Sequence, residues 1–281
     1  MSNLNKLQPT TLFGTITFVV IILLIFVGPL VYLQPADAID FALASQPPSL
    51  AHPFGTNTLG QDQLARIMLG GRVSLMVGLT AMAMAVSLGT AIGAIAGFYG
   101  GLLDSLLMRF TDLFLSLPQL PLSLLVIYLF GDWARDQLGP QNGIFALVVL
   151  VIGGFNWMSV ARLVRAGFLS TRDRTFMQAI QALGAKPPRL IWHHLLPNVL
   201  GPVIVAATLA VGNAVLAEAT LSFLGLGFPP DVPTWGRMLF TAQDYLASAP
   251  HMAIFPGAAI FLTVLSINFI GDGLRDGLDP N

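Results

Sequence analysis

Residues 73–103 read VSLMVGLTAMAMAVSLGTAIGAIAGFYGGLL and contain no charged side chain. A helix needs about 20 apolar residues to cross the hydrocarbon core of a bilayer, so this run is long enough. Its apolar residues are continuous rather than alternating, which favours a transmembrane helix over a strand of a membrane barrel. The run therefore predicts that the chain folds inside a membrane.

Five further charge-free runs support this class. They cover residues 7–36, 113–131, 137–161, 195–217 and 252–271. The chain is 55% hydrophobic and only 10% charged, whereas soluble proteins carry about 25% charged residues. We predict an all-α polytopic membrane protein with about six transmembrane helices, of which the one at 113–131 is barely long enough to span.

The placement of lysine and arginine predicts the orientation. With the N-terminus inside, nine of these residues lie on the cytoplasmic side: Lys6, Arg109, Arg162, Arg165, Arg172, Arg174, Lys186, Arg189 and Arg275. Four lie outside: Arg66, Arg72, Arg135 and Arg237. Because cytoplasmic loops of membrane proteins are enriched in these cations, we expect both termini and the loop 172–197 in the cytoplasm.

The first run also needs to be distinguished from a signal peptide. Ala36-Asp37-Ala38, which follows it, resembles a signal-peptidase site. The apolar stretch 13–33 is 21 residues long, and a typical signal core has only ~7–15 residues. We expect an uncleaved first span.

We predict that the chain is divided into three parts. Residues 1–50 form an N-terminal segment with the first transmembrane helix, and residues 73–281 form a core of five further transmembrane helices. Between them, residues 51–72 form an outer loop that ends in a short interfacial helix at Leu64–Leu69. In a second outer segment, 228–250, Trp235 and Tyr245 are expected to anchor at the membrane interface.

Small residues recur on one face of the second span. Gly89, Gly93 and Gly97 are four residues apart, and this spacing lets another helix approach closely. Tight packing within the chain is the first interpretation, and contact with a helix of a partner protein is the alternative.

Two polar or helix-breaking features lie at membrane depth or next to it. Pro118 and Pro121 interrupt the third span, and a broken helix of this kind can line a translocation pathway. Glu218 follows the fifth span, and an ionisable group there is a candidate pathway residue. A solvated carboxylate at the helix end is the alternative interpretation of Glu218.

Several chemistries lack the residues that they require. Without cysteine there is no disulfide or thiolate site, and a net charge of −1 provides no general attraction for nucleic acid. Neither Lys6 nor Lys186 lies in the Gly-Lys-Ser/Thr pattern of a phosphate-binding loop. His193 and His194 are adjacent, so on a helix they point about 100° apart and do not chelate together. We expect no catalytic residue, metal or cofactor.

The loop 172–197 carries a family pattern. Gln178-Ala179-Ile180 is followed after three intervening residues by Gly184, and after nine further intervening residues by His194-Leu195-Leu196-Pro197. This resembles the EAA loop of ABC-importer permeases, which reads Glu-Ala-Ala, three residues, Gly, nine residues, Ile, one residue, Leu-Pro. Gln178, Ile180 and His194 depart from that pattern.

Other motifs narrow the resemblance to the dipeptide/oligopeptide/nickel permease family, C-type subunit. They are His52-Pro53-Phe54-Gly55-Thr56, Leu59-Gly60-Gln61-Asp62, Leu216-Ala217-Glu218-Ala219, Leu221-Ser222-Phe223-Leu224-Gly225-Leu226-Gly227 and Gly271-Asp272-Gly273-Leu274-Arg275-Asp276. The similarity extends from about residue 50 to the C-terminus. Gln61 stands where the family commonly has arginine.

The resemblance implies a type I ABC-importer permease with the MetI-like fold in the bacterial inner membrane, and makes residues 73–281 its permease core. Its implied partners are a second permease, two ABC ATPase subunits, an extracytoplasmic substrate-binding protein and membrane lipid. ATP hydrolysis would belong to the ATPase subunits. The substrate is expected to be a peptide, and nickel chelates, opines or sugars are the alternatives within the family.

The resemblance also implies how the loop works. A helix over Phe176–Leu183 would dock on an ATPase subunit, and Gly184 would end that helix in a left-handed conformation. Pro187 and Pro188 would prevent its continuation. The residues assigned to this ATPase-coupling loop are Phe176, Gln178, Ala179, Ala182, Gly184, Leu196 and Pro197. Glu218 and Pro118 are the candidates for the translocation pathway.

A membrane enzyme, an export-type permease and a membrane scaffold are the alternatives to an importer. A membrane enzyme would need ionisable groups clustered at one depth, and the sequence contains no such cluster. An export-type permease or a membrane scaffold would differ from an importer in not depending on an external binding protein.

Overall fold

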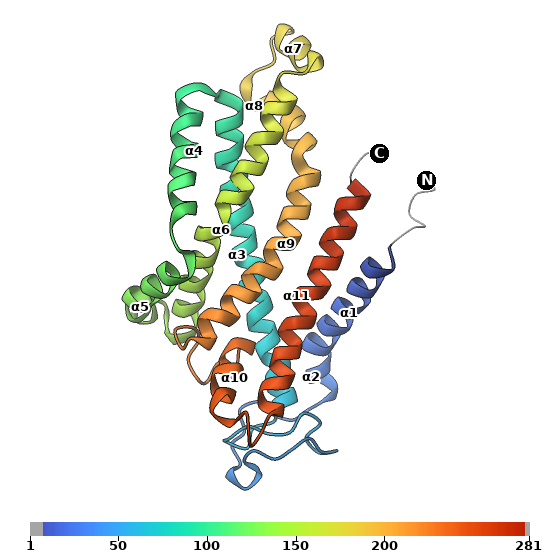
Figure 1. Cartoon of the computed structure of the whole chain (residues 1–281), viewed down its shortest axis with the longest axis vertical. Helices are drawn as coiled ribbons and strands as arrows, with labels where there is room; N and C mark the ends of the chain where they lie inside the picture. Colours follow the sequence, from blue (N-terminus) through green and yellow to red (C-terminus); the bar gives the residue numbers. More distant parts are fainter. Residues whose placement is uncertain (1–7, 279–281) are drawn as a thin grey trace.

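Five long helices form a bundle in the computed structural model, which describes residues 8–278 (Figure 1). These helices are α1 (Pro9–Phe26), α3 (Gln63–Tyr99), α6 (Pro140–Arg172), α9 (Leu196–Phe223) and α11 (His251–Leu278). All five are long and apolar enough to cross a membrane. The predicted all-α membrane class is therefore confirmed.

The third predicted span is a bent pair of helices. α4 (Gly101–Ser116) and α5 (Gln119–Leu138) meet at an angle of 85°, and Pro118 is the N-cap residue of α5. Proline has no backbone N–H and disfavours helical geometry in the residue before it, so the helix ends at this point. The described residues thus hold five spans, or six if the bent pair crosses as one.

The second span begins earlier than the sequence suggests. The expected interfacial helix Leu64–Leu69 is the first part of the 37-residue helix α3, and the division at residue 72 falls inside that helix. Gly70 and Gly71 do not break it, because both pack against neighbours. A Cβ at Gly70 would lie 2.6 Å from the carbonyl oxygen of Pro233, and one at Gly71 would lie 2.7 Å from the Ile25 side chain.

The glycines of α3 hold it against α6. A Cβ at Gly89 would lie 2.6 Å from the carbonyl oxygen of Trp157, and one at Gly97 would lie 2.6 Å from Cβ of Phe168. A Cβ at Gly93, one turn from each, would collide with the carbonyl oxygen of Ala161. The glycines at 89, 93 and 97 therefore allow close packing within the chain. This confirms the first interpretation, and not the alternative of contact with a helix of a partner protein.

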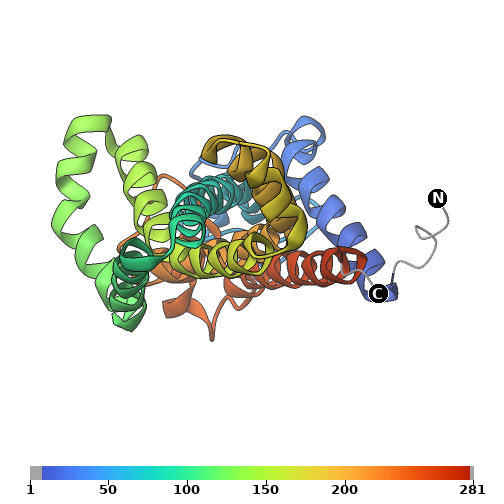
Figure 2. The same ribbon diagram turned by 90° about the horizontal axis from the view of Figure 1, so that it is seen from above.

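The remaining spans assemble around this pair. Seen from above, α4 and α5 lie at one edge of the bundle, and α1 with α11 lies toward the other (Figure 2). α1 lies against α11, where a Cβ at Gly14 would be 2.6 Å from Cβ of Phe269. At the other edge, Arg165 of α6 donates a 2.7 Å hydrogen bond to Asp104 of α4.

The two ends of the bundle differ. One end carries the short helix α7 (Thr175–Ala182) and α8 (Pro187–Leu190), and the chain enters α1 and leaves α11 toward that end (Figure 1). The opposite end carries the short elements α2 (Gly28–Val31), η1 (Phe41–Leu43), α10 (Trp235–Ala242) and η3 (Gln243–Tyr245).

Asp62 organises the loop between α2 and α3. One carboxylate oxygen caps α3 by accepting from the backbone N–H of Ala65 at 2.8 Å. The other accepts from the Tyr32 hydroxyl at 2.7 Å and lies 2.8 Å from Nδ1 of His52. Burial, together with the hydrogen bond to this carboxylate, raises the pKa of Tyr32. The motif residues His52 and Asp62 thus shape this end of the molecule.

We predict that Gly93→Leu destabilises the chain by about 1–3 kcal/mol or more, because the added side chain meets the backbone of α6. The matched control is Gly154→Leu on α6, where an added Cβ meets no atom within 4 Å. The difference in stability is measured from the temperature at which each variant aggregates in mild detergent. Equal melting of the two variants would mean that the α3–α6 contact tolerates side chains.

Candidate functional site

The loop 172–197 projects from one end of the bundle and is mostly helical (Figure 1). The helix expected at Phe176–Leu183 is present as α7, shifted by one residue to Thr175–Ala182. After a turn, Pro187 and Pro188 form the first turn of α8. The two prolines therefore start the next helix as well as following the end of α7, because proline fits the first helical positions.

α7 is attached to the bundle through one face. Met177 is fully buried in an apolar cluster with Phe168 of α6, Leu190 of α8 and Val199 of α9. Ile180, three residues further on, packs against the same cluster. This spacing puts both side chains on one face of the helix, so the rest of α7 faces outward.

The outward side of α7 collects five of the residues predicted for the coupling loop. Phe176, Gln178, Ala179, Ala182 and Gly184 are all exposed. Leu183, which was not assigned to the site, is 88% exposed. Together with the exposed Phe176, Ala179 and Ala182, it forms an apolar patch at this end of the bundle. We call Phe176, Ala179, Ala182 and Leu183 the α7 surface.

Gly184 ends α7 as expected. Its φ is +84°, in the left-handed region that favours glycine. The backbone N–H of Ala185 donates to the carbonyl oxygen of Ile180 at 3.3 Å, which is the six-to-one bond of a Schellman motif. A Cβ at Gly184 would meet no atom within 4 Å, so space around this residue is open.

Leu196 and Pro197 lie away from that surface, in the first turn of α9. Leu196 is partly buried and packs on the cluster that anchors α7. The preceding turn, Ile191–Leu195, is a π-helix. Pro197 cannot donate to the carbonyl four residues earlier, which accounts for the wider turn there. These two residues join the loop to the fifth span.

Glu218 is fully buried near the opposite end of α9. The Ser74 hydroxyl of α3 donates to its Oε2 at 2.9 Å, and the Ser222 hydroxyl donates to Oε1 at 2.7 Å. The interpretation as a solvated helix end is therefore wrong. Pro118 is exposed at the α4–α5 bend, and no hydrogen bond of Glu218 reaches that bend.

Sequence reasoning missed the partners of Glu218. Ser222 could have been found, because it is four residues away on the same helix face. Ser74 is 144 residues away and gives no such signal. Trp235, expected at the membrane interface, is buried instead, and its indole N–H donates to the carbonyl oxygen of Ile67 at 3.0 Å.

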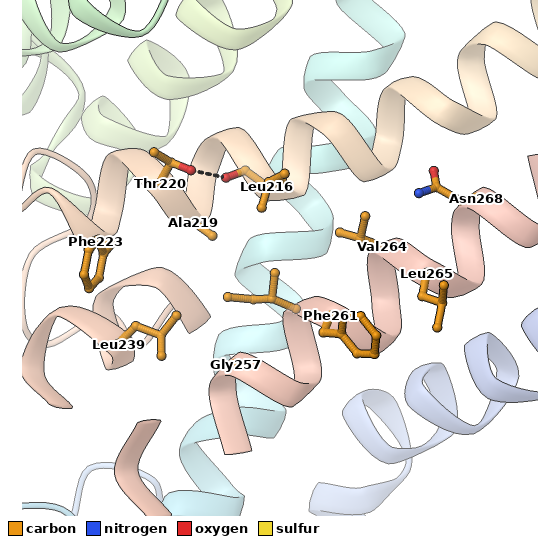
Figure 3. Close-up of a pocket in the computed structure, with 11 residues that line it drawn as sticks. Leu216, Ala219, Thr220, Phe223, Leu239, Gly257, Phe261, Val264, Leu265 and Asn268 are labelled. Carbon is orange, nitrogen blue, oxygen red and sulfur yellow. Dashed lines mark hydrogen bonds between the residues drawn. The ribbon is translucent and has the colours of Figure 1, made fainter. Parts of the chain in front are cut away.

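The opposite face of the same stretch of α9 borders an apolar cavity of about 550 Å³ (Figure 3). Leu216 and Phe223 of α9 line it together with Leu239 of α10, Phe261 and Asn268 of α11. Successive residues of a helix point about 100° apart, so Glu218 faces α3 while its neighbours face the cavity. Glu218 is not among the residues that line the cavity.

Comparison with known proteins places this geometry in a family. Residues 89–281 match the family model described as binding-protein-dependent transport system inner membrane component. The chain is 43% identical over 235 residues to the dipeptide transport system permease protein DppC of Alkalihalophilus pseudofirmus, covering 84% of this chain and 74% of that protein. It is 37% identical over 252 residues to the glutathione transport system permease protein GsiD of Pectobacterium atrosepticum, covering 89% and 80%.

A solved structure supports the fold independently. The inward-facing MetNI methionine ABC transporter aligns with a TM-score of 0.55, covering 75% of this chain and 95% of the matched one, at 18% identity. At this identity the similarity establishes the fold alone, and it confirms the MetI-like fold. The resemblance to ABC-importer permeases is confirmed by the family match. The chain therefore belongs to the family of binding-protein-dependent transport system inner membrane components, and is a multi-pass permease of the inner membrane.

Proposed function

We propose that this chain is the C-type permease subunit of an ATP-driven importer, and that it moves peptides into the cytoplasm by alternating access. The observation that carries the proposal is the α7 surface, an exposed apolar patch held on a buried anchor at one end of a membrane bundle. Such a patch suits docking to a soluble protein, because both partners bury apolar area there.

We infer the partners from the family to which the chain belongs. Two ABC ATPase subunits hydrolyse ATP below the membrane, and one of them receives α7. A second permease subunit completes the pathway, and an extracytoplasmic binding protein delivers the solute. The start of α1 and the end of α11 lie on the side of α7 (Figure 1), and we assign this side and both termini to the cytoplasm, in agreement with the lysine and arginine distribution.

The substrate assignment rests on the relatives. One is named as a dipeptide permease and another as a glutathione permease, and glutathione is itself a tripeptide. The apolar cavity beside α9 contains a single amide side chain, Asn268, and no charged group. We take this cavity to border the pathway, where it would offer no strong selectivity by charge, and we assign the choice of solute to the binding protein.

The movement that follows ATP binding is transmitted through α7. The Met177 anchor ties α7 to α6, α8 and α9 at once, so a displacement of α7 displaces all three. When packed helices shift together as rigid bodies, the bundle changes between an outward-open and an inward-open state.

We predict that the chain, purified from its native membrane in mild detergent, brings a second multi-span permease and one or two P-loop ATPases with it. Mass spectrometry identifies these proteins. Uptake of a labelled dipeptide into cells then tests the substrate, with nickel, an opine and a sugar as comparison solutes. Recovery of the chain alone, even after crosslinking through residues 172–197, would contradict the importer function.

We predict that Gly184→Trp leaves membrane insertion intact and abolishes peptide uptake, because the ring fills the open space from which the ATPase approaches. The control is Gly184→Ala, which carries the backbone strain of a left-handed residue, about 1–2 kcal/mol, without the bulk. Uptake per amount of chain in the membrane is the measurement. If alanine is as harmful as tryptophan, strain rather than docking explains the loss.

We predict that Leu183→Ser weakens retention of the ATPase roughly tenfold, corresponding to a loss of about 1.4 kcal/mol. The chain itself should stay stable, because this side chain is already 88% exposed. Leu50→Ser, at a fully exposed leucine in the segment between α2 and α3 at the opposite end, is the matched control. Normal ATPase retention by the Leu183 variant would exclude this residue from the docking surface.

A further inference from the structure

Glu218 connects three elements rather than lining an opening. It lies on α9 and receives hydrogen bonds from Ser74 on α3 and from Ser222 one turn further along α9. The Ser74 hydroxyl oxygen in turn lies 3.4 Å from the backbone N–H of Trp235, the first residue of α10. The carboxyl group is thus the point at which α3, α9 and the start of α10 meet.

The start of α10 is fitted closely into this junction. The backbone N–H of Trp235 lies 3.4 Å from the Ser74 hydroxyl oxygen, and its indole N–H bonds to the backbone of α3. A Cβ at Gly236 would lie 2.6 Å from Cα of Ala219 on α9. Thr234 caps α10 by accepting from the backbone N–H of Arg237 at 3.2 Å. Contacts this close leave α10 no room to shift relative to α3 or α9.

No cation pairs with Glu218 in the part of the chain that the structure describes. The ion pairs between residues 8 and 278 all involve aspartates. A buried carboxyl group that is held by hydroxyl groups alone works through hydrogen bonding and shape. An amide of the same shape can serve as well, because each serine hydroxyl can donate or accept.

We infer that Glu218 is a positioning residue that ties α10 to α3 and α9, so that the three elements move as one body at this end of the molecule. The transport consequence of this tie rests on the proposed function. The tie itself does not, and it can be measured without transport.

Because the chain contains no cysteine, one introduced thiol can be labelled specifically in it. Met238→Cys places one thiol on the buried side of α10, within the apolar cluster that contains Trp235 and Ala219. The complete transporter in native membranes is treated with a water-soluble maleimide, and labelling of this chain is followed over time. In the parent the thiol is expected to react slowly, because its position is buried.

Adding Glu218→Ala is expected to speed labelling at least about tenfold, the factor that corresponds to about 1.4 kcal/mol. Adding Glu218→Gln is expected to leave labelling close to that of the parent. The matched control is Thr263→Val on α11, a fully buried hydroxyl without a hydrogen-bond partner among the described residues. It is expected to leave labelling unchanged.

Peptide uptake separates the tie from a charged pathway residue. If Glu218 is a positioning residue, the glutamine variant still takes up peptide and the alanine variant does not. Loss of uptake in both variants to the same extent would overturn the inference, and so would equal labelling of the alanine variant and the parent. If the alanine variant does not reach the membrane, Ser74→Ala replaces it with the same expected increase in labelling. If the parent transporter itself takes up no peptide, the proposed substrate is rejected, and faster labelling of the alanine variant than of the parent would still support the tie.

Discussion

The close approach of α3 and α6 is the contact on which the rest of the structure depends. Glycine at 89, 93 and 97 lets the backbone of α6 lie where side chains would otherwise be. In lipid, helices gain no hydrophobic energy by leaving the solvent, so such backbone contact supplies much of their association through dispersion. α3, at 37 residues, extends beyond this contact and supports α9 through Gly78, which packs against Val215.

From this pair, both ends of the molecule are positioned. α6 continues past the contact to Arg172 and leads directly into α7. Phe168, on the same part of α6, contributes to the cluster that buries Met177. At the other end, α3 carries Ser74 to the carboxyl group of Glu218. One helix pair thus supports both the α7 surface and the junction around α10.

α9 connects these two regions. Together with α8 and the π-helix that precede it, α9 forms the helical stretch Pro187–Phe223. This stretch is long and apolar enough to be one membrane span. Val199 near its beginning lies in the cluster that anchors α7, and Glu218 near its end lies in the junction with α3 and α10. Within the proposed importer, α9 is therefore the element that relates ATPase docking on one side to the arrangement of α10 on the other.

The sequence by itself determined the features that depend on near neighbours in the chain. Apolar runs predicted the spans, Pro118 predicted the break in the third one, and Gly184 predicted the left-handed end of α7. These hold because span length, proline geometry and positive φ are local properties.

Only the tertiary structure decided how distant segments meet. It decided that Leu64–Leu69 continues into α3, that Trp235 is buried and that Glu218 is shielded from water. The partner of Glu218 at Ser74 is 144 residues away in sequence. No periodicity along the chain encodes such a contact, because it arises only when α3 and α9 are packed side by side.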